Sequence, residues 1–244
     1  MRVALVGCGG IGWHLAEPVA RTLNASSQTE DHKLFLVDGD SIEAGNMERQ
    51  YFQGAVGKGK ANVLAERLGS MFPDIEIVPV GAFVNPETLR FHRDMWFNSG
   101  IMILAGVDNN ASRAFLEDEA AKVKSVVLVL GGNDETSGQA SMYVRRNGRE
   151  LSPRITTWTP ELRQTDGKMP GMGTCQRSGS VQSATANRAA ALCMELLWGH
   201  ARSSAKMRFN EARFNLGEMM MKGFWMDPFG QFKKEVKEEE EKGR

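Results

Sequence analysis

The chain has 244 residues, in which 30 Lys and Arg balance 30 Asp and Glu, and 41% of its residues are hydrophobic. A chain of this size and composition can bury a full core, which excludes the disordered and fibrous classes. Nucleic acids and membrane surfaces bind proteins that carry an excess of basic residues, because their phosphates are negatively charged. The balanced charge of this chain therefore predicts neither kind of partner. No apolar run approaches the roughly 18 residues of a membrane span. The N-terminus lacks a signal-peptide pattern, so a cytoplasmic location is expected.

The first half of the chain alternates apolar strand patterns with amphipathic helix patterns. The predicted strands span residues 2–7, 34–37, 75–80, 101–105 and 126–130. The predicted helices span residues 11–23, 60–71, 86–97 and 111–122. This alternation predicts an α/β fold in which a mostly parallel sheet carries helices on both faces.

The second half predicts antiparallel strands added to that sheet. A strand over residues 139–146 is followed by a turn at Asn147–Gly148. A loop over residues 155–179, roughly 25 residues long, has few periodic apolar positions. Beyond it we expect a helix over 184–198 and a final strand over 207–216. An apolar cluster outside regular structure is expected at Met219–Met221, Phe224, Trp225, Met226 and Phe229. One domain is expected over residues 1–232, followed by a charged tail over 233–244.

A glycine-rich turn directly follows the first predicted strand. Its glycines, Gly7, Gly9, Gly10 and Gly12, form the pattern GxGxxG between a strand and a helix. Such glycines permit a tight turn and bring helix N–H groups close to a phosphate. Asp38 ends the second predicted strand, where a carboxylate can bind ribose hydroxyls. The first 38 residues therefore predict a nucleotide site.

The next residues favour a nucleoside triphosphate over a dinucleotide. Arg49 and Lys60 add two cations after the glycine turn. An arginine fork and a lysine point charge suit a polyphosphate. Asp108 ends the fourth predicted strand, and as a hard oxygen ligand it can hold Mg²⁺. Its alternative role is to cap the helix that follows.

These motifs together resemble the ThiF/MoeB/HesA superfamily of ubiquitin-activating-enzyme-like adenylyltransferases. The pattern GxGGxG, DxD, NxxRQxx, GxxKA and DNxxxR occurs here in order over roughly residues 3 to 132. The resemblance implies a Rossmann-like fold that uses ATP and Mg²⁺ to adenylate the C-terminal glycine of a ubiquitin-like or sulfur-carrier protein. The resemblance also implies a conjugating enzyme as a further partner, and a homodimer or heterodimer.

The resemblance also assigns roles to individual residues of the first half. Gly9 and Gly10 line the phosphates and Asp38 takes the ribose, while Asp40 and Asn46 shape the site.

For the polyphosphate and the metal, the resemblance assigns a second group of residues. Arg49, Gln50 and Lys60 contact the polyphosphate, and Asp108 holds magnesium.

The second half resembles the smaller prokaryotic ThiF-like proteins, including those of PRTRC-type gene clusters. The residues that carry this likeness are Gly131–Asn133, Gly138, Gln139, Cys175, Gln182, Asn187 and Arg213–Leu216. In family members that form a thioester, the nucleophilic cysteine lies in the crossover loop. The loop predicted here over residues 155–179 corresponds to it and contains Cys175. Cys175 is therefore either a nucleophile or an incidental loop cysteine. The other cysteines, Cys8 and Cys193, are expected to fill the glycine turn and the core.

The chain departs from the family pattern in three places. The usual N-terminal helix with its arginine, the paired CxxC zinc ligands and a C-terminal ubiquitin-fold domain are not seen in the sequence. No structural zinc is therefore expected. Because the arginine is missing, an alternative interpretation is that the protein is a non-catalytic nucleotide-binding subunit of a heteromeric activating complex. A third interpretation, based on the glycine turn, is an NAD-dependent oxidoreductase.

Overall fold

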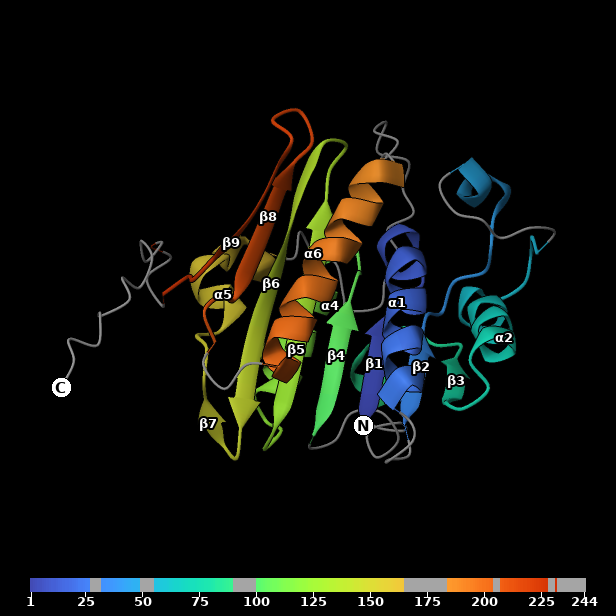
Figure 1. The fold of residues 1–244 in the computed structure, drawn as a ribbon, viewed down its shortest axis with the longest axis horizontal. Helices are drawn as coiled ribbons and strands as arrows, with labels where there is room; N and C mark the ends of the chain where they lie inside the picture. The colour runs from blue at the N-terminus through green and yellow to red at the C-terminus, as the bar shows by residue number, and fades with distance from the viewer. Residues whose placement is uncertain are drawn as a thin grey trace.

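The computed structural model describes residues 1–26, 32–48, 55–89, 100–164, 184–203, 207–227 and 231. Within these ranges nine strands form one mixed sheet, in the order β3-β2-β1-β4-β5-β6-β8-β9 with β7 paired to β6 (Figure 1). The strands are β1 (Arg2–Val6), β2 (Lys33–Val37), β3 (Glu76–Val80), β4 (Ile101–Ala105), β5 (Val126–Asn133), β6 (Ser137–Arg146), β7 (Arg149–Glu150), β8 (Glu211–Asn215) and β9 (Met220–Phe224).

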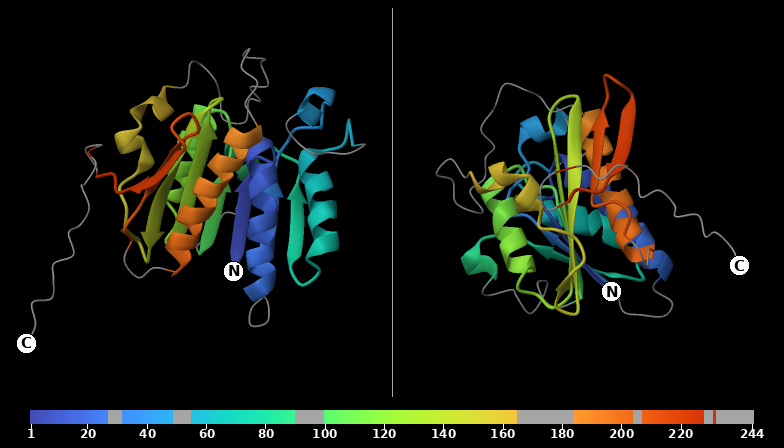
Figure 2. Two further views of the ribbon diagram at one scale, coloured as in Figure 1. Left: turned by 45° about the horizontal axis from the view of Figure 1, so that its top comes forward. Right: turned by 90° about the vertical axis from the view of Figure 1, so that its left-hand side faces the viewer.

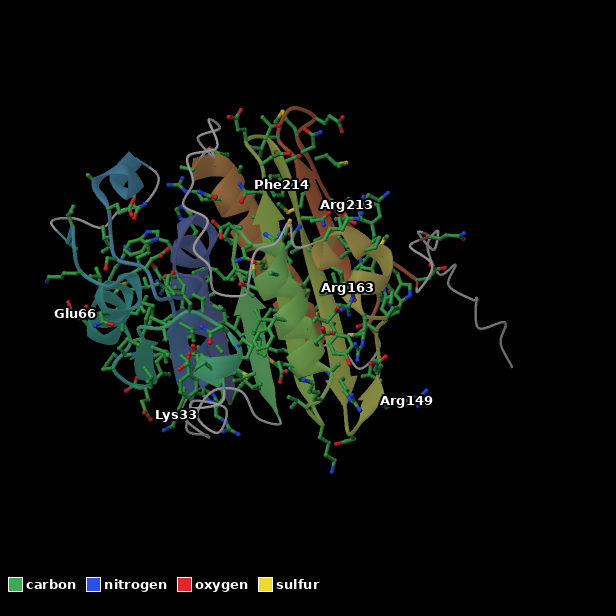
Figure 3. All side chains as sticks on the ribbon, turned by 180° about the vertical axis from the view of Figure 1, so that it is seen from behind. Lys33, Glu66, Arg149, Arg163, Arg213 and Phe214 are labelled. Atoms are coloured by element: carbon green, nitrogen blue, oxygen red, sulfur yellow. The ribbon has the colours of Figure 1, made fainter. Side chains whose placement is uncertain are left out.

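Helices cover both faces of this sheet. The helical segments of the described residues are α1 (Gly10–Ser26), η1 (Ala44–Glu48), α2 (Lys60–Met71), α4 (Asn110–Ala120), α5 (Ile155–Trp158), η2 (Pro160–Arg163) and α6 (Ala184–Ser203). One core lies under α1, α2 and α6, and a second lies under α4 on the opposite face. The right-hand view of Figure 2 separates these layers, and α4 is in front of the sheet in Figure 3.

Strands β1 to β5 form the parallel half of the sheet. β1 pairs in parallel with β2 and β4, β2 with β3, and β4 with β5. Four consecutive residues are buried in both β1 and β2, as expected where helices cover a parallel sheet on both faces. The predicted α/β fold is confirmed, and the carboxyl ends of these strands meet at one edge of the sheet, at the top of Figure 1.

The remaining strands are antiparallel, as predicted. β6 pairs with β5, β7 and β8, and β8 pairs with β9. The predicted turn between β6 and β7 is confirmed, because Asn147 and Gly148 both have positive φ, at 52° and 82°. Two left-handed residues match the twist of a hairpin, and asparagine and glycine adopt that conformation most readily.

Three sequence predictions need correction in this half. The strand predicted over 207–216 is shorter, Glu211–Asn215, and it is not the last, because β9 follows it. The methionines predicted to lie outside regular structure belong to this hairpin, where Met219 turns the chain with φ of 49°. The loop predicted over 155–179 begins with α5 and η2. Sequence periodicity missed all three because β9 is an exposed edge strand and the two helices are only four residues long.

Other predictions fall partly outside the described residues. The predicted helix over 86–97 is helical through residue 89, where the described range ends. The charged tail over 233–244 lies outside it. No helix in the described ranges is long and apolar enough to cross a bilayer.

A buried carboxylate joins α4 to the start of α5. Glu117 is fully buried in α4, and it accepts hydrogen bonds from the backbone N–H groups of Ile155 and Thr156, the latter at 3.1 Å. The carboxylate thereby satisfies N–H donors that a helix N-terminus leaves unpaired. This contact fixes the chain where it enters the predicted crossover loop.

We expect Glu117→Gln to lower the free energy of unfolding by about 1–3 kcal/mol, because the amide turns one acceptor into a donor facing buried N–H groups. The neighbouring Asp118→Asn is the control, since Asp118 pairs with Arg154 and Arg163 at the surface. Surface pairs contribute about 0–1 kcal/mol. Urea unfolding measures both, and equal losses would contradict the capping role.

Candidate functional site

The glycine turn brings the start of α1 against the ends of β1 and β2. Gly7 has φ of +87°, and its N–H donates to the carbonyl of Val37 at 2.8 Å. A Cβ atom on Gly12 would lie 1.8 Å from the Gly7 carbonyl oxygen. Only glycine fits such an approach, so the turn presents its backbone N–H groups at the carboxyl end of the sheet.

Asp38 is fixed at the end of β2 by two backbone donors. Its carboxylate accepts from the Cys8 N–H at 2.6 Å and from the Asp40 N–H at 2.8 Å. Burial raises the pKa of Asp38, whereas both N–H groups and the charge of Lys60 favour the carboxylate. The carboxylate is thus tied to the glycine turn before any ligand enters. Cys8 is buried and burial raises its pKa well above normal, which fits the predicted filler and no reactive thiolate.

Lys60 and Asp40 form a charged pair beside this carboxylate. Lys60 opens α2, and its Nζ lies 2.9 Å from Asp40 Oδ2. The lysine is only 4% exposed, and its own N–H donates to the Asp40 carbonyl at 2.9 Å. Asn46 is also buried, and its Oδ1 accepts from the Glu43 N–H at 3.0 Å. The cation is therefore held in place rather than free to sample solvent.

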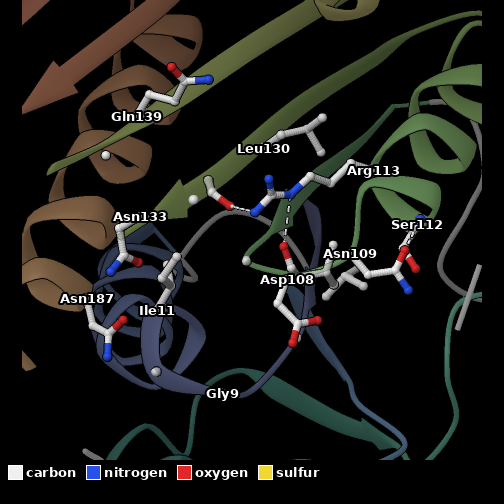
Figure 4. A pocket seen from close by; sticks show the side chains of 18 of the residues that line it. Gly9, Ile11, Asp108, Asn109, Ser112, Arg113, Leu130, Asn133, Gln139 and Asn187 are labelled. Carbon is white, nitrogen blue, oxygen red and sulfur yellow. Dashed lines mark hydrogen bonds between the residues drawn. The ribbon is translucent and has the colours of Figure 1, made fainter. Parts of the chain in front are cut away.

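Asp108 and Asn109 follow β4, but only Asn109 caps a helix, whereas Asp108 faces the pocket. Asn109 is the N-cap of α4 and accepts from the Ser112 N–H at 2.9 Å, so the alternative role of Asp108 as that cap is wrong. Asp108 is exposed in the pocket, and its carboxylate points toward Gly9 (Figure 4). A solvent-facing carboxylate next to a phosphate site suits Mg²⁺, which takes one or two protein ligands and completes its shell with phosphate oxygens and water.

No group of three or more His, Cys, Asp or Glu residues in the described part of the chain could hold a metal by itself. Oxygens of a bound nucleotide would complete the ligand shell of a magnesium ion at Asp108. The donor chemistry fits a nucleotide-bound magnesium ion.

Arg113 lines the pocket and holds two strand ends in place. Its Nε donates to the Val107 carbonyl at 2.9 Å and its Nη2 donates to the Gly131 carbonyl at 3.1 Å (Figure 4). Burial lowers the pKa of Arg113, and the charge of Asp108 opposes that shift. The arginine of the sequence pattern DNxxxR therefore fixes the backbone ends of β4 and β5.

These residues line one pocket of about 730 Å³ at the carboxyl ends of β1, β2 and β4. β1 and β4 are neighbours although β2 and β3 intervene in sequence, and ligands of open α/β sheets bind where the strand order reverses in this way. The pocket continues to β6 and β8, where Gln139 and Arg213 contribute to its wall. It therefore has a parallel side and an antiparallel side.

The structure brings together most of the residues predicted from the sequence. Those lining the pocket are Gly7, Gly9, Gly10, Asp38, Asp40, Asn46, Lys60 and Asp108. Gly12 supports the turn from beneath. Arg49, Gln50 and Cys175 lie outside the described residues.

The polar residues of the antiparallel side have no role predicted from the sequence. Arg213 Nε donates to Glu211 Oε1 at 2.5 Å, and the fully buried Glu211 also accepts from Trp158 Nε1 at 2.7 Å. A third donor is the Ser141 hydroxyl, at 3.2 Å. A glutamate in a strand of alternating charge resembles a surface residue, so its burial carried no sequence signal.

The ThiF family model matches residues 1–224. Among curated proteins, the chain is 29% identical over 158 residues to the NEDD8-activating enzyme E1 catalytic subunit of Arabidopsis thaliana, covering 59% of this chain and 32% of that one. It is 27% identical over 133 residues to the tRNA threonylcarbamoyladenosine dehydratase of Haemophilus influenzae, covering 53% and 47%. The chain thus spans less than half the length of these relatives.

Solved structures share the fold at low sequence identity. PaaA superposes with a TM-score of 0.66 at 16% identity, covering 95% of this chain and 64% of that chain. E. coli MccB, in its structure with AMPCPP and MccA, superposes with a TM-score of 0.64 at 16% identity, covering 93% and 64%. Because the family model extends over nearly the whole chain, including the antiparallel strands that complete the pocket, the protein belongs to the ThiF family.

Proposed function

We propose that this protein binds ATP in the described pocket and adenylates a carboxylate substrate. The observation that carries the proposal is the joining of the glycine turn, Asp38 and the Lys60–Asp40 pair into one wall of the pocket. The turn offers N–H groups to phosphate oxygens, Asp38 accepts from ribose hydroxyls, and Lys60 neutralises phosphate charge.

In the proposed reaction, an oxygen of the substrate carboxylate attacks the α-phosphorus of ATP. The bond to the bridging oxygen breaks and pyrophosphate leaves, which gives an acyl-adenylate. No proton has to move, so the protein contributes positioning and charge neutralisation. Magnesium, bound by Asp108 and phosphate oxygens, would supply further neutralisation of the leaving group.

The proposed substrate is the C-terminal glycine carboxylate of a ubiquitin-like or sulfur-carrier protein. This substrate is supported by the names of two relatives. They are the NEDD8-activating enzyme E1 catalytic subunit of Arabidopsis thaliana and human ubiquitin-like modifier-activating enzyme 7, the latter 28% identical over 144 residues. MccB has been crystallised with ATP, which supports the nucleotide. Dimerisation, a conjugating enzyme and acyl transfer to Cys175 stay predictions of the sequence.

We expect ATP with Mg²⁺ to raise the melting temperature and NAD to leave it unchanged. The reason is that the Lys60–Asp40 pair can neutralise the charge of a triphosphate, whereas a dinucleotide does not need it. At 100 times its dissociation constant, ATP should stabilise the fold by about 2.7 kcal/mol. A thermal-shift assay with each nucleotide measures this. Stabilisation by NAD alone would favour the oxidoreductase reading instead.

We expect Asp108→Asn to remove the effect of Mg²⁺ on ATP affinity. Calorimetric titration of ATP with MgCl₂ and with EDTA should show tighter binding with the metal in the wild type and little difference in the variant. The exposed position of Asp108 means that the fold should be retained.

Glu135→Gln is the matched control, because it removes the same charge from an exposed position on the β5–β6 turn that does not line the pocket. Its magnesium effect should equal that of the wild type. A magnesium effect that survives in Asp108→Asn would place the metal on other ligands.

A further inference from the structure

An orphaned carboxamide lines the pocket where α6 meets the glycine turn. Asn187 of α6 is 1% exposed, and among the residues that the structure describes neither its Nδ2 nor its Oδ1 has a hydrogen-bond partner. Leaving a buried polar group unpaired costs about 1–3 kcal/mol, and the large majority of such groups in proteins are paired. The residue lines the pocket, so a ligand there could supply both missing partners.

The position of Asn187 indicates which part of a bound ligand would lie next to it. A Cβ atom on Gly10 would lie 2.4 Å from Nδ2 and 2.9 Å from Oδ1 of Asn187, so the carboxamide lies directly against the start of α1 (Figure 4). It comes from α6, which packs on α1, β5 and β6. Asp38 approaches the same turn from β2, through the Cys8 N–H. Ribose at Asp38 and a ligand group at Asn187 would therefore flank the phosphate turn from different sides.

The donors and acceptor of the carboxamide restrict the chemical groups that can pair with it. Asn187 offers donors at Nδ2 and an acceptor at Oδ1. Phosphate and carboxylate oxygens at neutral pH are acceptors only, and they would satisfy Nδ2 while leaving Oδ1 unpaired. A peptide unit has both a carbonyl acceptor and an N–H donor. A ligand with a peptide bond next to the reacting carboxyl therefore satisfies both orphaned atoms.

We propose that Asn187 is a substrate-binding residue that hydrogen-bonds the last peptide unit of the acyl group, with Oδ1 accepting its N–H. This proposal rests on the adenylation proposed above. It gives the pocket a means of distinguishing a polypeptide C-terminus from a small carboxylic acid, at a residue outside the nucleotide motifs.

Two stable mimics of the acyl-adenylate test the proposal. They are 5′-O-sulfamoyladenosines that carry an N-acetylglycyl or a 4-oxopentanoyl group, which differ only in a peptide N–H replaced by CH₂. Calorimetry should show that the wild type binds the N-acetylglycyl probe roughly three- to tenfold more tightly, the value of one hydrogen bond to a buried acceptor. In Asn187→Leu this preference should disappear while the affinity for ATP is unchanged.

Stability of the ligand-free protein separates a binding role from a structural one. Because no residue in the described ranges pairs with the Asn187 carboxamide, Asn187→Leu should not lower the melting temperature. If the leucine variant does not fold, Asn187→Ala gives the same comparison with less crowding at Gly10.

Three results would overturn the proposal. They are equal binding of the two probes by the wild type, a preference that survives in the variants, and a loss of ATP affinity as large as the loss of probe affinity. A wild type that binds neither ATP nor the probes would instead contradict the proposed function itself.

Discussion

The close approach of α1 to the end of β1 is the constraint on which the site depends. Gly12 lies under the Gly7 carbonyl at a distance that no side chain allows, and Gly7 needs a left-handed backbone to make the turn. The same turn offers its Cys8 N–H to Asp38, so the strand end of β2 is joined to it. A ligand that binds the turn is thereby placed against Asp38 without rearrangement, which keeps the entropic cost of binding low.

The second feature of the molecule is a change of strand direction beside that turn. The parallel half of the fold supplies the glycine turn, Asp38, Lys60 and Asp108, whereas β6, β8 and α6 supply Gln139, Arg213 and Asn187. A pocket between the two kinds of sheet can hold two chemically different reactants. The parallel side has the groups that suit a nucleotide. The antiparallel side, with a buried Glu211 orienting Arg213, has polar groups that suit a second substrate.

Much of the parallel half could be predicted from the sequence, because its signals are local. A glycine pattern after an apolar strand and Asp38 at the next strand end both depend on neighbours in the chain. The antiparallel side depends on residues far apart in sequence, such as the contact of Asn187 with Gly10. Short helices and the edge strand β9 gave too few residues for a periodic pattern. Assigning the helix cap to Asn109 rather than Asp108 needed the backbone itself.

The proposed function requires ATP to bind at the glycine turn that joins β1 to α1. An NMR titration of the isotopically labelled protein with ATP and Mg²⁺ tests it most directly, because each backbone amide reports its own surroundings. Saturable shifts should be largest at Gly9, Gly10 and Asp108, with little change at the β3 edge around Glu76. Shifts confined to the β8–β9 hairpin, or no saturable shift at the glycine turn, would contradict it.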